Sequence, residues 1–347
     1  MPLLTTTLGS FPKPDYVPTP DWFRGGMESP TAAYSAYLQN LPDNINEIHD
    51  RATREVVELQ VELGIDIPTD GEMRREDYIN YQLRNFEGYD FESLTHQVLR
   101  NGAWEAHVAT VRGPIRSKTP KLPADYKIAQ SATTNPVKIT LPGPLTITGS
   151  TADDFYHDKA ALGWDLATAL NHEILALAEA GCTWIQVDEP VFARNPDLAL
   201  EFGFRNLERC FAGLPAHVNK VVHMCCGYPM HLDQTDYEKA SRDVYFDLAN
   251  AIDESIIDAI SLEDAHAHND ITLLEQFEKT KVIWGSVAIA KSEIESAETI
   301  KERLKQALNH IDPERLIVAP DCGLGFLTQE MVKQKLGNMA EAAHSFG

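Results

Sequence analysis

The sequence predicts an α/β protein in which a single (β/α)8 TIM barrel spans residues 1–347. Eight short apolar runs, each followed by turn residues, alternate along the chain with longer amphipathic patterns. The runs are continuously apolar, which is typical of a parallel sheet covered on both faces. A doubly wound open sheet is the alternative, but neither a glycine-rich dinucleotide fingerprint nor a P-loop is present to support it.

The predicted strands are bounded by turn residues and are rich in Val, Ile, Leu and Thr. In chain order they cover residues 4–8, 64–69, 136–143, 183–190, 220–226, 258–263, 281–289 and 315–323. The clearest predicted helices cover residues 45–64, 159–181, 298–311 and 328–346. The first two end in glycine, which commonly follows a helix C-terminus. Residues 12–31 and 113–126 are expected to be inserted surface loops, and long loops after barrel strands often build an active site.

Composition restricts the class of partner. The formal net charge is -22, and a surface this acidic repels nucleic acid and anionic membranes. No apolar run is long enough for a membrane span and no signal-peptide pattern is present, which predicts a cytoplasmic protein. The five cysteines are widely spaced, so we expect buried hydrophobes, metal ligands or nucleophiles rather than disulfides.

Metal-binding side chains stand at the carboxyl ends of several predicted strands. His223 and Cys225 end one strand, Glu263 ends the next, and Cys322 follows the last apolar run. In a barrel these ends meet on one face. Residues two apart on a strand point the same way, so His223 and Cys225 face together while Cys226 is expected to pack as a hydrophobe. Any one of them alone would suggest an ordinary core residue, but the set predicts a metal site.

The ligand types select the metal and suggest the chemistry. Two thiolates, an imidazole and a carboxylate suit tetrahedral Zn²⁺. The carboxylate is the weakest ligand, so Glu263 is expected to exchange for a substrate thiolate. Zinc removes the proton from a thiol whose pKa is ordinarily about 8.5, and the anionic cysteine ligands leave the bound sulfur nucleophilic. The sequence therefore predicts an enzyme that alkylates a thiol.

Five segments resemble the cobalamin-independent methionine synthases. The zinc-site segments of that family resemble HMC (223–225), SLE (261–263) and PDCGL (320–324). Its N-terminal substrate loop and its acidic strand end resemble TTTLGSFPKP (5–14) and IQVDEP (185–190). The resemblance covers nearly the whole chain, but only the catalytic C-terminal barrel of the full-length enzymes. It implies a zinc-dependent methyltransferase that converts homocysteine to methionine, with the four residues named above as ligands.

The resemblance also implies how homocysteine is held. Leu8, Gly9 and Ser10 would meet its carboxylate through backbone and hydroxyl groups. Glu72 and Asp188 would bind its ammonium, which is a favourable pairing of opposite charges. The alternatives are a surface charge for Glu72 and a helix cap for Asp188.

Folate-binding features of the family are missing from this sequence. Ser150 stands where a pterin-stacking tryptophan would fall, Arg194 replaces a glutamate, and Ala290 and Lys291 occupy the place of a proton-donating histidine. We therefore expect a methyl donor other than methyltetrahydrofolate, with methylcobalamin or a corrinoid protein as candidates. His266 is a catalytic candidate that could supply a proton instead, or else an ordinary loop residue.

Two other functions stay open. The zinc site also resembles that of the epoxyalkane:coenzyme M transferases, but carboxylates at Glu72 and Asp188 would repel a sulfonate thiol. The chain could also be a non-catalytic metal-binding or partner-binding barrel, since uroporphyrinogen decarboxylases show that this kind of barrel also works without zinc. An ammonium-bearing thiol fits the two acids best, so homocysteine is the expected substrate.

Overall fold

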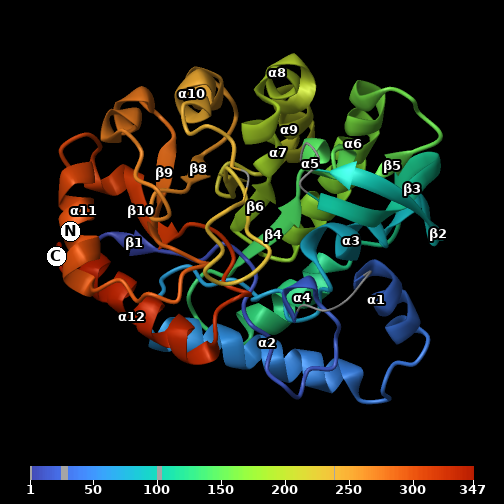
Figure 1. The fold of residues 1–347 in the computed structure, drawn as a ribbon, viewed down its shortest axis with the longest axis horizontal. Helices are drawn as coiled ribbons and strands as arrows, with labels where there is room; N and C mark the ends of the chain where they lie inside the picture. The colour runs from blue at the N-terminus through green and yellow to red at the C-terminus, as the bar shows by residue number, and fades with distance from the viewer. Residues whose placement is uncertain (1, 25–29, 100–103, 238) are drawn as a thin grey trace.

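The computed structural model describes residues 2–24, 30–99, 104–237 and 239–347, and its central feature is a ring of parallel strands (Figure 1). Seven strands form one sheet in the order β1, β10, β9, β8, β7, β6 and β4. Their bounds are Leu4–Thr5 (β1), Lys138–Pro142 (β4), Trp184–Asp188 (β6), Asn219–Met224 (β7), Ala259–Leu262 (β8), Lys281–Val287 (β9) and Leu316–Pro320 (β10). Each lies within or next to a strand predicted from the sequence.

An eighth segment closes the ring between β1 and β4. Ile67 bridges Thr6 and Thr69 bridges Lys138, both in the parallel sense. The segment makes only these two bridges because the proline between them has no amide hydrogen to donate. The predicted (β/α)8 barrel is therefore confirmed, with the strand predicted at residues 64–69 reduced to a short closure.

Helices surround the barrel, and the four predicted from the sequence correspond to α2, α6, α11 and α12. The longer helices are α2 (Ile45–Glu62), α6 (Lys159–Glu179), α10 (Val244–Glu254), α11 (Ala297–Ala307) and α12 (Gln329–His344). Shorter ones are α1 (Pro30–Leu38), α3 (Tyr78–Leu83), α4 (Leu122–Gln130), α5 (Pro144–Thr148), α7 (Pro190–Arg194), α8 (Pro196–Leu198) and α9 (Phe204–Phe211). Further short helical segments are η1 (Trp22–Arg24), η3 (Ala199–Gly203), η4 (Ile271–Gln276) and η5 (Pro313–Arg315). Side-chain caps fix helix starts: Asp158 accepts hydrogen bonds from Ala160 N and Ala161 N at the start of α6.

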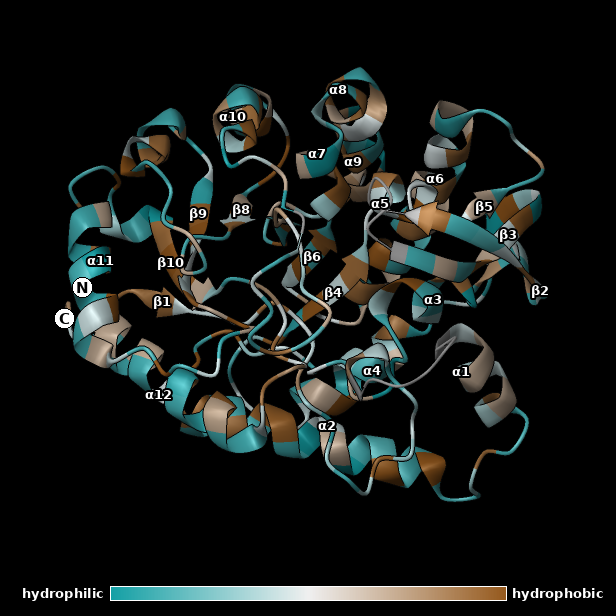
Figure 2. Cartoon of the chain, viewed as in Figure 1, coloured by the Kyte–Doolittle hydropathy of each residue, from teal (hydrophilic) through white to brown (hydrophobic). Residues whose placement is uncertain are grey.

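Two apolar layers stabilise the barrel. Inside the ring, a buried cluster contains Leu8, Ile67, Trp184, Val221, Ala259, Ile283, Ile317 and Ala319. A larger cluster lies between the strands and the surrounding helices. Figure 2 shows the strands as mostly hydrophobic, while the helices alternate between hydrophobic and hydrophilic residues. Because the strands contribute to both layers, their sequences are continuously apolar.

The expectation of an inserted loop at residues 113–126 is wrong. Residues up to Ser117 belong to β3 (Trp104–Ser117), which pairs with β2 (Phe86–Leu99) in a long hairpin, and α4 begins at Leu122. The short strand β5 (Ala152–Asp153) completes this second sheet. From the sequence alone, a proline such as Pro114 disfavours a strand. In the structure Pro114 lies opposite a shift in the β2–β3 register, where a missing amide hydrogen is tolerated.

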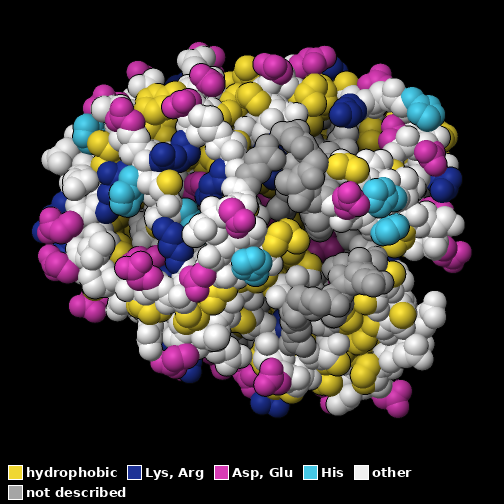
Figure 3. Space-filling model, viewed as in Figure 1, with side chains coloured by type: hydrophobic (Ala, Val, Ile, Leu, Met, Phe, Trp, Pro, Cys, Tyr) yellow, Lys and Arg dark blue, Asp and Glu magenta, His cyan; other side chains and the backbone are white. Residues whose placement is uncertain are grey.

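The other expected loop, residues 12–31, is mostly irregular where it is described. It contains η1 and the start of α1, and residues 25–29 lie outside the described residues. No helix among the described residues is both long enough and apolar enough to cross a membrane. Figure 3 shows acidic side chains spread over the visible face with lysine and arginine between them, in keeping with the net charge of -22.

Candidate metal centre

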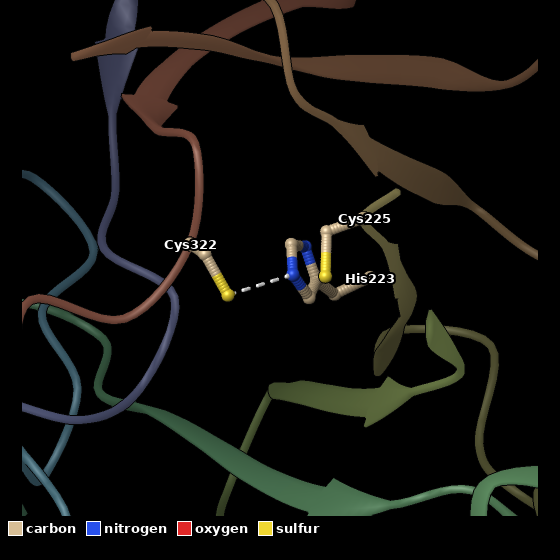
Figure 4. Close-up of side chains that lie close together, drawn as sticks. All are labelled: His223, Cys225 and Cys322. Atoms are coloured by element: carbon tan, nitrogen blue, oxygen red, sulfur yellow. Dashed lines mark hydrogen bonds between the residues drawn. The ribbon is translucent and has the colours of Figure 1, made fainter. Parts of the chain in front are cut away.

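Three predicted ligands meet at the carboxyl ends of the strands (Figure 4). Among the described residues, His223, Cys225 and Cys322 form a group whose donor atoms all lie within 4.8 Å of one another. His223 is in β7, Cys225 directly follows that strand, and Cys322 follows β10. The Sγ atom of Cys322 lies 3.3 Å from Nε2 of His223. Segments about a hundred residues apart thus place two sulfurs and an imidazole nitrogen around one point.

The His223 ring is oriented by a neighbour on the next strand. Its Nδ1 lies 3.0 Å from the hydroxyl oxygen of Ser261, which stands opposite His223 in the β7–β8 register. This contact turns Nε2 toward the two sulfurs, the arrangement expected of a metal-ligating histidine. Sequence reasoning missed Ser261, although its position two residues before Glu263, on the same face of the strand, is a signal that could have found it.

The geometry and chemistry of this group fit a zinc ion. Zinc binds sulfur at about 2.3 Å and nitrogen at about 2.0 Å, so tetrahedral ligand atoms lie roughly 3.5 Å apart. The 3.3 Å separation of Cys322 Sγ and His223 Nε2 agrees with this value. A hydrogen bond from Cys322 holds the pKa of Cys225 well below its usual value, so one sulfur is already favoured as thiolate. Cys226 packs in the outer apolar cluster instead, as expected.

Glu263, the fourth predicted ligand, has its carboxylate turned toward Lys239. One oxygen accepts a hydrogen bond from Lys239 Nζ at 2.7 Å, and the other accepts one from the backbone N–H of Cys226 at 3.3 Å. Glu263 is 2% exposed, and it lies outside the group of three whose donor atoms converge. Its role as a ligand stays a prediction. Lys239 was not foreseen, because a lysine in a polar loop after β7 carries no pattern in the sequence.

Asp188 lies beside the metal-binding group at the end of β6. It stands opposite His223 in the β6–β7 register and accepts a hydrogen bond from Gln186 Nε2 at 2.7 Å. The same Gln186 nitrogen donates to the carbonyl oxygen of Leu8 at 3.2 Å, which brings the predicted substrate loop to this strand end. Burial raises the pKa of Asp188 to about 7. Burial favours the protonated carboxyl group, and a cation bound beside it would favour the charged carboxylate instead.

Glu72 and Gly9 are in close contact beside β4, the strand that pairs with the Asp188 strand β6. A Cβ atom on Gly9 would lie 2.7 Å from Glu72 Oε1, which is too close. Gly9 also has a φ of +133°, so both the contact and the backbone conformation disfavour a side chain at this position. Glu72 is 7% exposed, which rules out the alternative of a surface charge. Its Oε1 accepts from Thr140 Oγ1 at 2.9 Å and lies 3.4 Å from Arg75. Burial raises the pKa of Glu72.

Ser10 lies against the segment that carries the third metal ligand. Its carbonyl oxygen accepts a hydrogen bond from Leu324 N at 2.7 Å. A Cβ on Gly323 would lie 2.2 Å from Ser10 Oγ, so glycine after Cys322 lets the two loops approach. The predicted substrate residues, from Leu8 to Asp188, are thus brought to the strand ends around the metal-binding group.

His266 is held by Asp321. The Asp321 carboxylate lies 2.7 Å from His266 Nδ1 and also accepts the backbone N–H of His266 at 2.7 Å. Nε2 of His266 is buried and has no hydrogen-bond partner among the described residues. Asp321 thus fixes the orientation of the His266 ring, and the catalytic role predicted for His266 stays a prediction.

The sequence matches the family model described as "Cobalamin-independent synthase, Catalytic domain" over residues 3–345. The chain belongs to this family. It is 28% identical over 345 residues to a methionine synthase of Sulfolobus acidocaldarius, covering 98% of this chain and 91% of the relative. It is 29% identical over 346 residues to one from Saccharolobus solfataricus, covering 98% and 94%.

A solved structure of the same family is similar over its whole length. It is the B12-independent methionine synthase from Shewanella sp. W3-18-1 in complex with selenomethionine, with a TM-score of 0.87 and 30% identity, covering 100% of this chain and 98% of that one. The resemblance to the cobalamin-independent methionine synthases that the zinc-site segments suggested is therefore confirmed. The prediction that the chain is an enzyme, a methyltransferase of this family, is confirmed with it.

Proposed function

We propose that this chain is a zinc-dependent methyltransferase that transfers a methyl group to the sulfur of homocysteine, from a donor other than methyltetrahydrofolate, and releases methionine. The observation that carries the proposal is the convergence of two sulfurs and an imidazole beside two buried carboxylates. The names of the relatives agree, and the Shewanella enzyme was solved with selenomethionine, an analogue of this product.

His223, Cys225 and Cys322 would hold the zinc ion, with Glu263 as the exchangeable fourth ligand. When bound, zinc supplies a Lewis acid that keeps a thiol deprotonated near neutral pH. The side chains of the protein orient the ligands and the substrate and exclude water. Ser261 keeps Nε2 of His223 directed at the site, and the buried Cys225 side chain would help to keep water away from the reacting thiolate.

Asp188 and Glu72 would bind the ammonium group of the amino acid and place its thiol at the metal centre. Both are buried with raised pKa values, so an incoming ammonium replaces lost hydration and favours their charged forms. Gly9 and Ser10 would meet the substrate carboxylate. These acids also argue against the alternative of a coenzyme M transferase, because a sulfonate would face uncompensated negative charge.

The donor is inferred from residues that the folate-using enzymes would need. Arg194 stands where the family places a glutamate, and its cation acts with Cys322 and His223, the larger contributors, to lower the pKa of Cys225. His266 remains the proposed proton carrier if the departing donor needs one. We therefore favour methylcobalamin or a corrinoid protein as the source of the methyl group.

The test uses the purified, zinc-loaded protein with homocysteine and either methylcobalamin or methyltetrahydrofolate. We expect methionine from methylcobalamin and none from methyltetrahydrofolate. Cys225→Ser and Cys322→Ser should each lower zinc content and abolish product. Product from methyltetrahydrofolate would overturn the donor assignment, and unchanged zinc content in both variants would overturn the metal centre.

A further inference from the structure

Lys239 and Glu263 form a partly buried ion pair next to the metal-binding group. Lys239 lies in the loop between β7 and α10, and its side chain is 23% exposed while that of Glu263 is 3% exposed. The 2.7 Å contact uses one carboxylate oxygen, and the backbone N–H of Cys226 uses the other at 3.3 Å. Each carboxylate oxygen of Glu263 thus has a hydrogen-bond partner, although Glu263 lies outside the group of three ligands whose donor atoms converge.

Besides Glu263, Lys239 has two neighbours that act on its charge, Asp321 and Tyr237, and the Tyr237 side chain is hydrogen-bonded to it. Asp321, the other buried carboxylate that acts on it, already accepts the backbone N–H groups of Asp264, Ala265 and His266. The ring of Tyr237 lies 5.4 Å from Lys239 Nζ, which is a second, weaker contact for the same cation. Glu263 is therefore the main anionic partner of Lys239 within the described parts of the chain.

We propose that Lys239 is a positioning residue that receives the Glu263 carboxylate when a substrate thiolate takes the place of Glu263 at the metal. This inference rests on the proposed function, since it needs a metal at His223, Cys225 and Cys322. A buried carboxylate released from a cation without a new partner is costly. The ammonium of Lys239 and the N–H of Cys226 supply that partner, so release of Glu263 becomes favourable enough for ligand exchange.

No bond to carbon is made or broken in this step. In this exchange Glu263 would leave the metal, the thiol sulfur would take its place, and the thiol proton would pass to solvent water. The carboxylate keeps its charge and changes its counter-ion from the metal to Lys239. The pair thus stabilises the thiol-bound state relative to the thiol-free state, in which Glu263 is at the metal.

The test is Lys239→Met, with Lys239→Arg as the matched control that keeps the charge. Lys239→Met removes one of the two partners that Glu263 has when it is not at the metal. We expect zinc affinity, measured by competition with a chelator without thiol, to tighten about 10-fold. We expect homocysteine affinity, measured by calorimetry on zinc-loaded protein, to weaken about 10-fold, the loss expected for one charge-assisted hydrogen bond. Lys239→Arg should stay within about 3-fold of the unaltered protein in both.

The opposite directions of the two shifts separate this role from a structural one, because general damage to the loop would weaken both affinities. Lys239→Met in a Glu263→Gln background should produce neither shift, since the variant glutamine carries no charge to exchange. If the unaltered protein binds no zinc or no homocysteine, the proposed function fails. If it binds both, and Lys239→Met shifts neither affinity or weakens both, the role of Lys239 alone is refuted.

Discussion

Replacing Asp188 with Asn tests how the site recognises an amino-acid thiol. Asp188 is 6% exposed, lies opposite His223 at the strand end, and burial raises its pKa to about 7. A charge-assisted hydrogen bond to a buried carboxylate contributes roughly 1.5–3 kcal/mol, and 1.4 kcal/mol corresponds to a tenfold change. We therefore expect Asp188→Asn to weaken homocysteine binding about 10- to 100-fold, measured by calorimetry on zinc-loaded protein at pH 7.5.

The same substitution should stabilise the metal-free fold at high pH. An aspartic acid has a pKa of about 3.9 in an unfolded chain. Because the folded-state pKa of Asp188 is raised to about 7, the fold retains its proton while the unfolded chain has lost it. The free energy of unfolding then falls as the pH rises from about 4 to about 7, by at most roughly 1.4 kcal/mol per pH unit. Asparagine has no such loss, so Asp188→Asn should melt higher at pH 8, with a smaller gain at pH 5.

Asp253→Asn is the matched control, because its carboxylate is shifted in the other direction. Although burial acts to raise it, hydrogen bonds from the backbone N–H groups of Thr280, Lys279 and Glu278 hold the pKa of Asp253 below its usual value. Asp253→Asn should melt lower at pH 8 and bind homocysteine normally. Unchanged thiol affinity in Asp188→Asn, or no gain in melting temperature at pH 8, would refute our account of Asp188.

Three further substitutions test the surroundings of the site. Ser261→Ala removes the partner of His223 Nδ1 and should weaken zinc binding about 10-fold or more by chelator competition, while Ser261→Thr should restore most of it. Gly9→Ala forces a Cβ to within 2.7 Å of Glu72 Oε1 and should lower homocysteine affinity more than zinc affinity; equal losses would contradict its placement in the substrate loop. Cys226→Ala should keep full zinc content, measured by metal analysis, because Cys226 packs in the outer apolar cluster; zinc loss in this variant would contradict the assignment.

The parts of the fold that the sequence could predict are those with strong local patterns. The barrel strands are continuous apolar runs, and their positions fix which side chains stand at the carboxyl ends. His223, Cys225 and Cys322 were found in this way, and their donor atoms do converge. The hairpin of β2 and β3 was missed because most of it is partly exposed and polar, and its register is interrupted near Pro114. Such strands depend on pairing with each other, which a local pattern does not record.

The parts of the site that escaped prediction are contacts between side chains from different loops. Lys239 reaches Glu263 from a polar loop, and Gln186 joins Leu8 to Asp188 across the barrel mouth. Neither a lysine in a loop nor a glutamine in a strand has a spacing that marks its role. Strand ends are positioned by the sheet, whereas loop side chains are positioned by tertiary packing, so the second kind of information appears only with the structure.

The balance of charge at the barrel mouth explains why metal and substrate should bind together. Glu72, Asp188 and Cys225 are buried groups that can each carry a negative charge, and burial raises the pKa of both carboxyl groups, so their charged forms need cationic partners. Lys138 lies within the barrel with a buried Nζ that has no hydrogen-bond partner among the described residues, and burial lowers its pKa to about 7, so it is only partly charged near neutral pH. A divalent cation and an ammonium would add positive charge to that of Arg75, which lies 3.4 Å from Glu72. Under the proposed function, the two carboxyl groups would favour a thiol that carries an ammonium, whereas a sulfonate or other anionic thiol would add negative charge beside them.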